Sequence, residues 1–221
     1  MTLKDIEANP HEWVGYFGYG SLVNDDTRNP ESFGFAGRLK GYRRRWSIWR
    51  SSEERRAFGF GGTAALSVEA DPDAYCDGLL VFDHKDHLPK VDERESMYDR
   101  VPLDLNHFDT PHDIPAGIDC YIYVGHPAHT DAVDPAFPIL QSYVDAVMQG
   151  FLHKFDRQGV ARFVEETEGW QTPIVKDRGR PFYPRSITLS LEEAELLDHY
   201  QKLSGAPMVT VDEALASKVA L

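Results

Sequence analysis

The segment Val14-Gly-Tyr-Phe-Gly-Tyr-Gly-Ser-Leu-Val23 (VGYFGYGSLV) lies close to the start of the sequence. Apolar and aromatic residues suited to a buried strand run directly into Gly18 and Gly20, which flank Tyr19. This bare turn allows two interpretations. It is a simple strand end, or it is a place where a ligand approaches the backbone. Glycine suits the second, because it permits positive φ, removes the Cβ atom and lets successive N–H groups converge on an anion.

Three common motifs do not fit this turn. Ser21 follows the second glycine directly, unlike the serine of the G-x-S-x-G nucleophile elbow. No Gly-Lys-Ser/Thr follows, as a phosphate-binding P-loop requires, and the third glycine of the dinucleotide fingerprint is missing. Other parts of the sequence therefore have to decide between the two interpretations.

The composition predicts a globular protein that acts on a small molecule. The chain has 221 residues, 42% of them hydrophobic and 27% charged, and a formal net charge of −13. This negative charge disfavours nucleic acid or an anionic membrane as a partner, since both require surplus Lys and Arg. No apolar run approaches the roughly 20 residues of a membrane span, and the N-terminus does not resemble a signal peptide. We expect a cytoplasmic protein; its oligomeric state stays open.

The first two-thirds of the chain read mainly as strands. Aromatic and aliphatic residues are concentrated in six segments that are separated by Gly, Pro and Asp, namely 14–19, 38–50, 64–70, 76–83, 98–105 and 119–125. The run Leu79–Phe82 lacks polar alternation, so we expect that strand to be covered on both faces. Cys76 and Cys120 lie in such apolar surroundings. We expect them to be buried free thiols, with a lone disulfide as the alternative.

Helical periodicity appears later in the chain. Apolar residues recur at intervals of three and four over 138–155, where Pro138 suits the first turn, and a shorter helix is expected over 159–167. The segment 172–186 is rich in Pro, Gly and Arg and has no period. We expect it to be an ordered surface loop or an insertion near a ligand site.

Two capping patterns predict helices near the C-terminus. Ser190 with Glu193 has the spacing of a capping box, and Gly205 with Pro207 ends the helix that follows. Thr210 repeats the pattern for a final short helix. Strands followed by helices indicate one α+β domain over 1–221, with a small, mixed, largely antiparallel β-barrel flanked by helices. Its core covers about 14–165, and a helical extension covers about 168–221.

Three further segments carry candidate site residues. In Asp92–Arg100, Glu95 lies where charged residues give way to an apolar strand, and a partly buried carboxylate there can act as a general base. In the basic segment 38–50, alternation puts Arg43 and Arg45 opposite Arg44 and Trp46. That strand has a basic outer face, or one arginine meets a substrate carboxylate. Histidines gather near Asp92 and Glu95, but their spacing matches no metal motif, and we expect no metal. They are His84, His87, His107 and His112.

At this point the sequence resembles the γ-glutamylcyclotransferase superfamily, and its ChaC-like branch in particular. Phe17-Gly-Tyr-Gly-Ser-Leu-Val23 matches the signature of the family, and Gly41–Trp46 is similar to its next element. Arg94–Asp99 resembles the segment that carries the essential glutamate of the family, and Cys120–Val124 a later strand. The helix that ends at 145–150 is also similar in kind. The resemblance covers about residues 14–165. It departs from the family at Ser96-Met97, where glycines are common, and after about residue 168.

The resemblance implies a fold, a reaction and a set of site residues. It implies a closed or nearly closed barrel with a pocket at one end. It also implies cyclisation of a γ-glutamyl compound to 5-oxoproline, with no cofactor. Carried over, the backbone of Tyr19, Gly20, Ser21 and Leu22 holds the γ-glutamyl group and Glu95 is the catalytic base, with a shielded side chain and a raised pKa. We further expect Tyr98 and Tyr123 to line the pocket and Arg44, or one of its neighbours, to meet a remote carboxylate.

Several functions stay open on the sequence. The substrate is glutathione, a γ-glutamyl amino acid or a γ-glutamyl amine, with ChaC-like features favouring glutathione. A protein of the same fold that binds a γ-glutamyl or carboxylate ligand without turnover is the alternative, and a structural interaction domain is a third. Glu95 together with the glycine turn favours catalysis, because binding alone needs no base.

Overall fold

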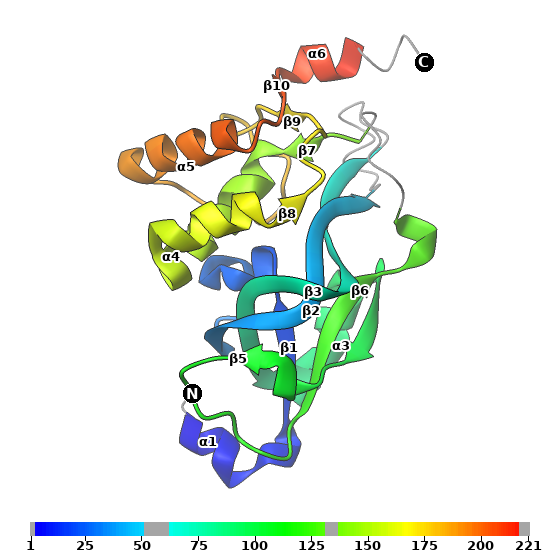
Figure 1. Cartoon of the computed structure of the whole chain (residues 1–221), viewed down its shortest axis with the longest axis vertical. Coiled ribbons are helices and arrows are strands. Elements are labelled where there is room, and N and C mark those ends of the chain that lie inside the picture. The colour runs from blue at the N-terminus through cyan, green and yellow to red at the C-terminus, as the bar shows by residue number, and fades with distance from the viewer. Residues whose placement is uncertain (1–2, 51–61, 131–136, 217–221) are drawn as a thin grey trace.

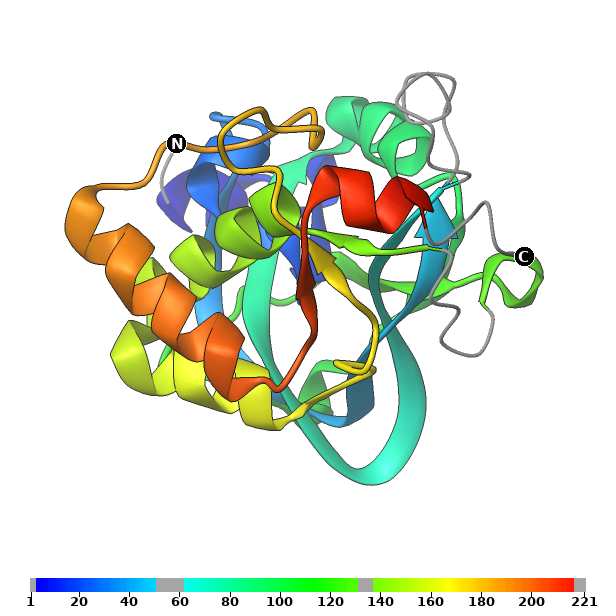
Figure 2. The same ribbon diagram turned by 90° about the horizontal axis from the view of Figure 1, so that it is seen from above.

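A long antiparallel ribbon of two strands forms the centre of the protein (Figure 1). The structure, a computed structural model, describes residues 3–50, 62–130 and 137–216. The ribbon pairs β2 (Phe33–Arg50) with β3 (Thr63–His84) and curls strongly, as Figure 2 shows from above. Gly41 has a φ of +97° at one of the two register shifts of the ribbon, a conformation that favours glycine.

The other strands extend this ribbon into one mixed sheet. Its order is β10-β9-β7-β3-β1-β6-β4, and β2 also pairs with β5 and β8. The pairs β1–β3, β2–β3, β2–β5 and β4–β6 are antiparallel, whereas β1–β6, β2–β8, β3–β7, β7–β9 and β9–β10 are parallel. The remaining strands are β1 (Trp13–Gly18), β4 (Tyr98–Pro102), β5 (Phe108–Asp109), β6 (Asp119–Gly125), β7 (Ile139–Leu140), β8 (Thr167–Glu168), β9 (Ile174–Val175) and β10 (Met208–Val209).

The α+β class and the mixed sheet agree with the sequence, but two strand predictions were wrong. The expected strands 64–70 and 76–83 are one strand, β3, which also includes residues 71–74, at the register shift opposite Gly41. The strand expected over 98–105 ends at Pro102. The pairings between the described residues do not join β10 to β4, so they do not show the expected closure of the barrel.

Helices cover the sheet on one side (Figure 1). The largest is α4 (Gln141–Glu165), and α5 (Leu191–Leu203) packs beside it. The helix predicted over 138–155 and the shorter one over 159–167 are two parts of α4, which meet at a kink where Asp156 has a φ of +59°. Pro138 lies outside the helix, because Ile139 and Leu140 pair as β7 with β9. The other helices are α1 (Leu3–Ala8), α3 (Leu88–Arg94) and α6 (Val211–Ala216).

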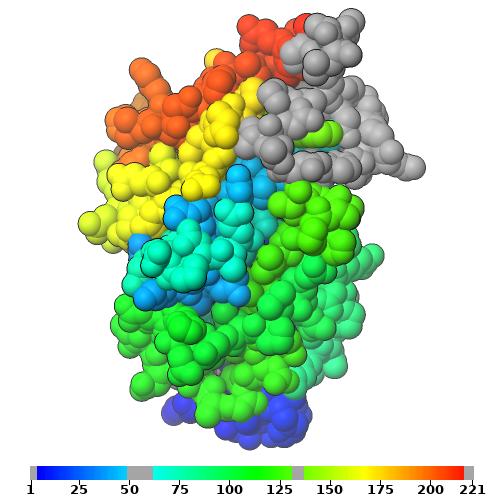
Figure 3. Space-filling model, turned by 45° about the vertical axis from the view of Figure 1, so that its right-hand side comes forward, coloured from blue at the N-terminus to red at the C-terminus, as the bar shows by residue number. Residues whose placement is uncertain are grey.

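The hydrophobic core lies between the sheet and α4. Leu79, Leu80, Val81 and Phe82 are each 0% exposed, as their unbroken apolar run predicts. Cys76 and Cys120 are buried and free, which confirms the thiol prediction. In the space-filling view, the orange atoms of α5 lie beside yellow atoms at the end of α4, and these lie against the blue and cyan atoms of the strands (Figure 3). None of the helices in the described ranges has the length and apolar character to cross a bilayer.

The C-terminal helices begin as their capping patterns predict. The Ser190 hydroxyl accepts a hydrogen bond from Glu193 N, and the Glu193 carboxylate accepts one from Ser190 N. The helix α5 then ends at Leu203, ahead of Gly205. Thr210 and Glu213 make the same reciprocal pair of hydrogen bonds before α6. These local signals therefore fix both helix starts.

Candidate active site

The glycine turn follows β1 directly. Residues Ser21–Val23 form a single 3-10 turn with Gly20 as its N-cap, at a φ of −132°. Gly20 therefore does not use the positive φ that glycine permits, and what matters here is the missing Cβ atom. A Cβ atom on Gly18 would lie 2.6 Å from Leu22 Cβ, and one on Gly20 would lie 3.3 Å from the hydroxyl of Tyr143. Glycine lets the turn fold back on itself and keeps space open beside it.

The carbonyl groups of this turn accept hydrogen bonds from side chains that follow it in the sequence. Thr27 Oγ1 donates to Ser21 O, and Arg28 Nη1 donates to Leu22 O and Val23 O, both at 3.4 Å. Within the turn, Val23 N donates to Gly20 O at 3.0 Å. Ser21 and Leu22 are the first two residues of this 3-10 turn. The first N–H groups of a helical turn have no acceptor within the turn itself. The backbone polarity of the turn therefore favours an anion.

Glu95 lies next to this turn. It is the C-cap of α3, and Glu95 N donates to Val91 O at 2.9 Å. Its side chain is 12% exposed, and Oε1 lies 2.8 Å from Arg94 Nε. Arg94 also donates from Nη2 to Ser21 Oγ at 3.1 Å and from Nη1 to Thr27 O at 2.6 Å. The Glu95 side chain is shielded from solvent as expected, but it is paired with a cation that ties it to the glycine turn.

Three tyrosines hold the neighbouring strands together. Tyr19 Oη donates to Tyr123 O at 2.5 Å, Tyr123 Oη donates to Asp92 at 2.7 Å, and Tyr98 Oη donates to Leu66 O at 2.7 Å. Burial raises the pKa of Tyr19 well above 10, as does the proximity of Tyr98 and Glu95. Burial and the hydrogen bond to Asp92 raise the pKa of Tyr123. Both hydroxyls therefore remain protonated donors at neutral pH.

These residues surround two adjoining cavities. We call the cavity beside the glycine turn the turn cavity, and the one beside Tyr183 and Arg185 the loop cavity. Their empty volumes, which include space open to solvent, are about 320 Å³ and about 400 Å³. Both are lined by Ser21, Glu95, Tyr98 and Tyr143. The turn cavity is otherwise lined by the glycine turn, β1, Leu66 and Tyr123. The loop cavity is otherwise lined by Thr63, Ala64, Ala65, Arg94, Leu140, Tyr183 and Arg185.

The structure thus brings together most of the site residues that the sequence suggested. Glu95 and the six residues expected to bind substrate through the turn and the pocket wall all line the turn cavity, namely Tyr19, Gly20, Ser21, Leu22, Tyr98 and Tyr123. Their positions in the chain span residues 19 to 123, so the strand order β3-β1-β6-β4 is what gathers them. A carboxylate therefore shares one hollow with a turn suited to an anion.

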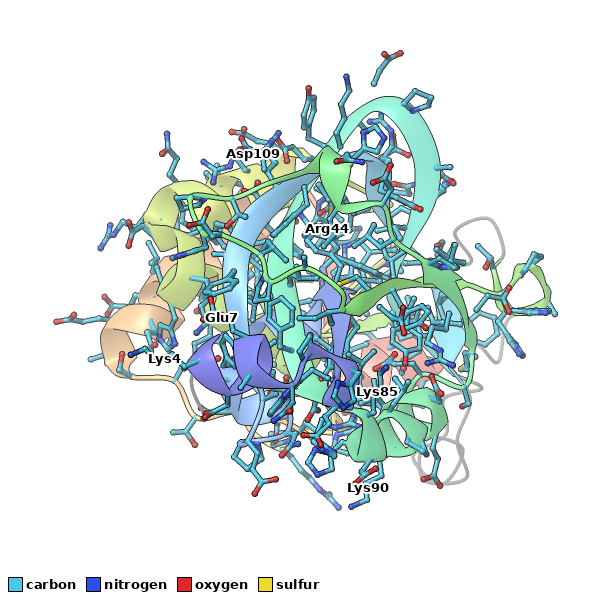
Figure 4. The ribbon with its side chains drawn as sticks, turned by 90° about the horizontal axis from the view of Figure 1, so that it is seen from below. Lys4, Glu7, Arg44, Lys85, Lys90 and Asp109 are labelled. Atoms are coloured by element: carbon cyan, nitrogen blue, oxygen red, sulfur yellow. The ribbon has the colours of Figure 1, made fainter. Side chains whose placement is uncertain are left out.

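Arg44 lies elsewhere. It is 1% exposed and lies in the interior of the molecule (Figure 4), where its guanidinium packs against the rings of Phe151 and Phe163. Its Nη1 donates to Tyr19 O at 2.9 Å, and its Nε donates to Thr167 Oγ1 at 2.9 Å. This placement does not agree with the expectation that Arg44 meets a substrate carboxylate. Arg44 instead supports the glycine turn from the core side.

The neighbours of Arg44 confirm the alternation along β2. Arg43 pairs with Asp71 at 2.6 Å, and Arg45 pairs with Glu69 at 2.8 Å, on the outer face. Trp46 is buried on the inner face, like Arg44. The basic segment therefore has ion-paired arginines on its outer face and one buried arginine on its inner face.

Among the described residues, no three His, Cys, Asp or Glu side chains form a cluster suited to a metal ion. His87 contacts Asp83 at 2.7 Å, and His107 lies 3.8 Å from Asp104. His84 lies beside Asp86, and His112 stacks on Phe35. The histidines therefore have separate local partners rather than a common centre.

Four charged or aromatic residues that line the loop cavity had no role assigned from the sequence. Arg94 belongs to the segment Arg94–Asp99 and Tyr143 to the helix expected over 138–155, but neither position indicated a site. Tyr183 and Arg185 belong to the aperiodic segment 172–186, where an insertion near a ligand site was one expectation. That segment does line the loop cavity, through these two side chains.

The comparisons with known proteins give a likeness of fold. No family model matches the sequence, and no curated protein does. A solved structure described as a gamma-glutamyl cyclotransferase is similar, with a TM-score of 0.53 and 16% identity over 85% of this chain and 99% of that one. An uncharacterized protein from Homo sapiens is similar with a TM-score of 0.52, at the same identity and coverage. The fold of this protein is therefore like that of a γ-glutamyl cyclotransferase.

Proposed function

We propose that the protein is a γ-glutamylcyclotransferase, which converts a γ-glutamyl compound to 5-oxoproline and a free amine. The observation that carries this proposal is the position of Glu95, which lines both cavities beside the glycine turn. A carboxylate and an anion-binding turn in one hollow suit a substrate with an α-carboxylate and an α-ammonium group. The likeness of fold to a gamma-glutamyl cyclotransferase supports the same conclusion.

The reaction is an internal transfer of the γ-glutamyl acyl group. Glu95 accepts a proton from the α-ammonium group, because only the neutral amine can attack. The amine nitrogen then forms a bond to the γ-carbonyl carbon and closes a five-membered ring. The bond from that carbon to the amide nitrogen breaks as Glu95 returns a proton to the leaving nitrogen. The ring nitrogen then gives up the second proton that it carries after the attack, and the released amine takes up this proton as an ammonium group. Atoms and charge balance without water, and no electron is transferred.

Positioning supplies much of the rate in this scheme. The N–H groups of Ser21 and Leu22 bind the α-carboxylate, which places the amine beside Glu95. The contact with Arg94 orients the Glu95 carboxylate. A substrate held folded in this way reacts intramolecularly, and oriented intramolecular reactions reach effective molarities of about 10⁵–10⁸ M. The turn and the base therefore act as one unit.

The finer features of this proposal rest on the sequence motifs. Phe17–Val23 and Arg94–Asp99 favour the ChaC-like branch, with glutathione or a γ-glutamyl amino acid as the substrate. The reaction as written needs no cofactor or metal. A closed barrel, a cytoplasmic location and one domain over 1–221 belong to the same proposal. A γ-glutamyl amine as substrate, or binding without turnover, is an outcome that the test below distinguishes.

The test is release of 5-oxoproline by the purified wild-type protein and by Glu95→Gln. Glutathione, γ-glutamyl-alanine and a γ-glutamyl amine are offered in parallel, with and without a chelator. We expect release by the wild type regardless of chelator, and a loss of about 10²–10⁴-fold in Glu95→Gln, the range that general acid–base groups contribute. Glu93→Gln is the matched control, because Glu93 is an exposed carboxylate on the same helix.

Activity of Glu95→Gln close to that of the wild type would contradict the assignment of the base. Binding of these compounds by the folded wild type without release would favour a binding protein of the same fold. Loss of release on chelation would show that a metal takes part.

A further inference from the structure

The segment 177–186 is fixed against the start of α4. The Asp177 carboxylate is 2% exposed. It accepts hydrogen bonds from Ser142 N at 2.8 Å, from Ser142 Oγ at 2.6 Å and from Phe182 N at 2.9 Å. Buried charge-assisted hydrogen bonds of this kind are shorter and stronger than neutral ones. The segment therefore has one defined position beside the cavities.

A second contact fixes the same segment. Arg178 donates from Nε and Nη2 to the two carboxylate oxygens of Asp145, at 2.7 and 2.8 Å, and lies 2.7 Å from Asp198 on α5. Its hydrogen bonds with Asp145 raise the pKa of Arg178. Arg178 is therefore engaged in the structure and is not placed to select substrates by charge.

This anchoring places Arg185 at the loop cavity. Tyr183 is 6% exposed, and its ring centroid lies 4.9 Å from that of Tyr143, which lines both cavities. Ser186 N donates to Tyr183 O at 3.0 Å, so the chain turns back after the tyrosine. Arg185 lies within this turn, is half-buried and lines the loop cavity together with Ser21 and Glu95.

Arg185 carries a charge that can bind an anion. Its guanidinium forms no ion pair with any described residue, in contrast to Arg94 and Arg178. It also lines a neighbouring hollow, which has both cationic and acidic side chains, namely Arg28, Lys90, Arg94, Asp26, Glu31 and Asp83. Arg28 is paired with Asp25, and Arg94 with Glu95. Arg185 is therefore a positive group at the loop cavity with a planar fork of donors, the geometry that binds carboxylates.

The different linings of the two cavities suggest how the substrate is oriented. Gly20, Leu22 and Tyr123 line the turn cavity alone, whereas Arg185 and Tyr183 line the loop cavity alone. Glu95 lines both, so the bond that breaks belongs at their junction. With the γ-glutamyl group in the turn cavity, the leaving amine extends into the loop cavity, towards Arg185.

We propose that Arg185 binds a carboxylate of the leaving amine, and that the protein prefers γ-glutamyl compounds whose amine is an amino acid or a peptide over neutral γ-glutamyl amines. This inference rests on the proposed function and adds its specificity. The role is not assigned to Arg178 or Arg180, because Arg178 is held by two carboxylates and Arg180 does not line either cavity.

The test compares γ-glutamyl-alanine with γ-glutamyl-alaninamide, which differ only in replacement of the leaving carboxylate by a neutral amide. We expect the wild type to favour the acid at least tenfold in kcat/KM for 5-oxoproline release. In Arg185→Gln, kcat/KM for the acid is expected to fall at least tenfold, through KM, and that for the amide less than threefold. Arg185→Lys retains part of the preference, and Arg180→Gln, a change to an exposed neighbour, leaves it intact.

The outcomes separate this inference from the proposed function. Equal turnover of the acid and the amide by the wild type would overturn the inference alone. Equal losses on both compounds in Arg185→Gln would overturn it as well, because a structural role moves both rates together. Release of 5-oxoproline from neither compound, nor from glutathione, by folded wild type would overturn the proposed function and this inference with it.

Discussion

Arg44 on β2 donates a hydrogen bond from Nη1 to the backbone oxygen of Tyr19 at 2.9 Å, and so joins the core of the long ribbon to the glycine turn. The same Nη1 donates to Asp77 O at 3.2 Å, and Nε donates to Thr167. The turn is therefore held on its core side by a cation and on its outer side by Arg28 and Arg94. The shape of the glycine turn therefore depends on side chains from other parts of the fold as well as on its own sequence.

Arg44→Met is expected to lower both stability and substrate affinity. Methionine fills part of the space beside the two phenylalanine rings but leaves buried acceptors unpaired, which costs about 1–3 kcal/mol per group. Urea denaturation measures the stability, and KM at a temperature where the variant is folded measures the affinity; we expect KM to rise at least tenfold. Arg45→Met is the control, and it is expected to cost about 1 kcal/mol or less, because its ion pair is on the outer face. Equal effects of the two substitutions would contradict the role of Arg44.

The two glycines of the turn are expected to respond differently to substitution. Gly18→Ala places a Cβ atom 2.6 Å from Leu22 Cβ and should cost about 1–3 kcal/mol of stability, as overpacking does. Gly20→Val crowds the turn cavity beside Tyr143 and Leu66, so it should raise KM with a smaller loss of stability. Gly179→Ala is the control, since a Cβ atom there meets no atom within 4 Å. An unchanged KM in Gly20→Val would show that the substrate does not approach this turn.

Local patterns predicted the local parts of this structure. The alternation along β2 put Arg44 and Trp46 on the face opposite Arg43 and Arg45, and the capping boxes at Ser190 and Thr210 placed two helix starts. Each of these features depends on residues a few positions apart, so the sequence contains the whole signal. The sequence also indicated the glycine turn and Glu95 as candidate site residues.

Features that depend on distant partners were not predicted. The two-residue strands β7, β9 and β10 exist only because they pair with one another and with β3, and Ile139 was therefore assigned to a helix. Arg44 was expected at the substrate, because the sequence does not show that it contacts Tyr19 O and two aromatic rings. Arg185 lines one cavity with Ser21 and Glu95, which precede it by at least 90 positions in the sequence, and its anchors at Asp177 and Arg178 are indicated by no short motif.

Both cysteines are expected to be unreactive in the folded protein. Burial raises the pKa of Cys120 to about 11 and also raises that of Cys76, so neither forms much thiolate at pH 8. An aromatic disulfide reagent should therefore find no fast-reacting thiol in the native protein and two thiols per chain in urea. One thiol that reacts at once without urea would contradict the burial of that cysteine.

The stability of the C-terminal helices should depend on acid pH through Glu193. Burial opposes ionisation of this carboxyl group, but hydrogen bonds from Ser190, His153 and Gln149 outweigh it and lower its pKa below 4.5. Because folding lowers the pKa, the stabilisation is complete above pH 4.5 and is lost as the pH falls through the folded value. Glu193→Gln should thus cost about 0.3–1 kcal/mol at pH 7 and almost nothing at pH 3, by urea denaturation. Glu195→Gln, on the exposed side of the same helix, is the control, and a cost of Glu193→Gln independent of pH would refute this account.

Asp177→Ala should affect the candidate site from a distance. The substitution leaves the buried N–H groups of Ser142 and Phe182 without their acceptor, at about 1–3 kcal/mol each. It also releases the segment that carries Tyr183 and Arg185, so we expect kcat/KM for γ-glutamyl-alanine to fall more than that for its amide. Lys176→Ala, at the exposed neighbour, should change neither quantity. If Asp177→Ala lost stability but kept the full preference for the acid, the position of Arg185 would not depend on this anchor, and Arg178 alone would hold the segment.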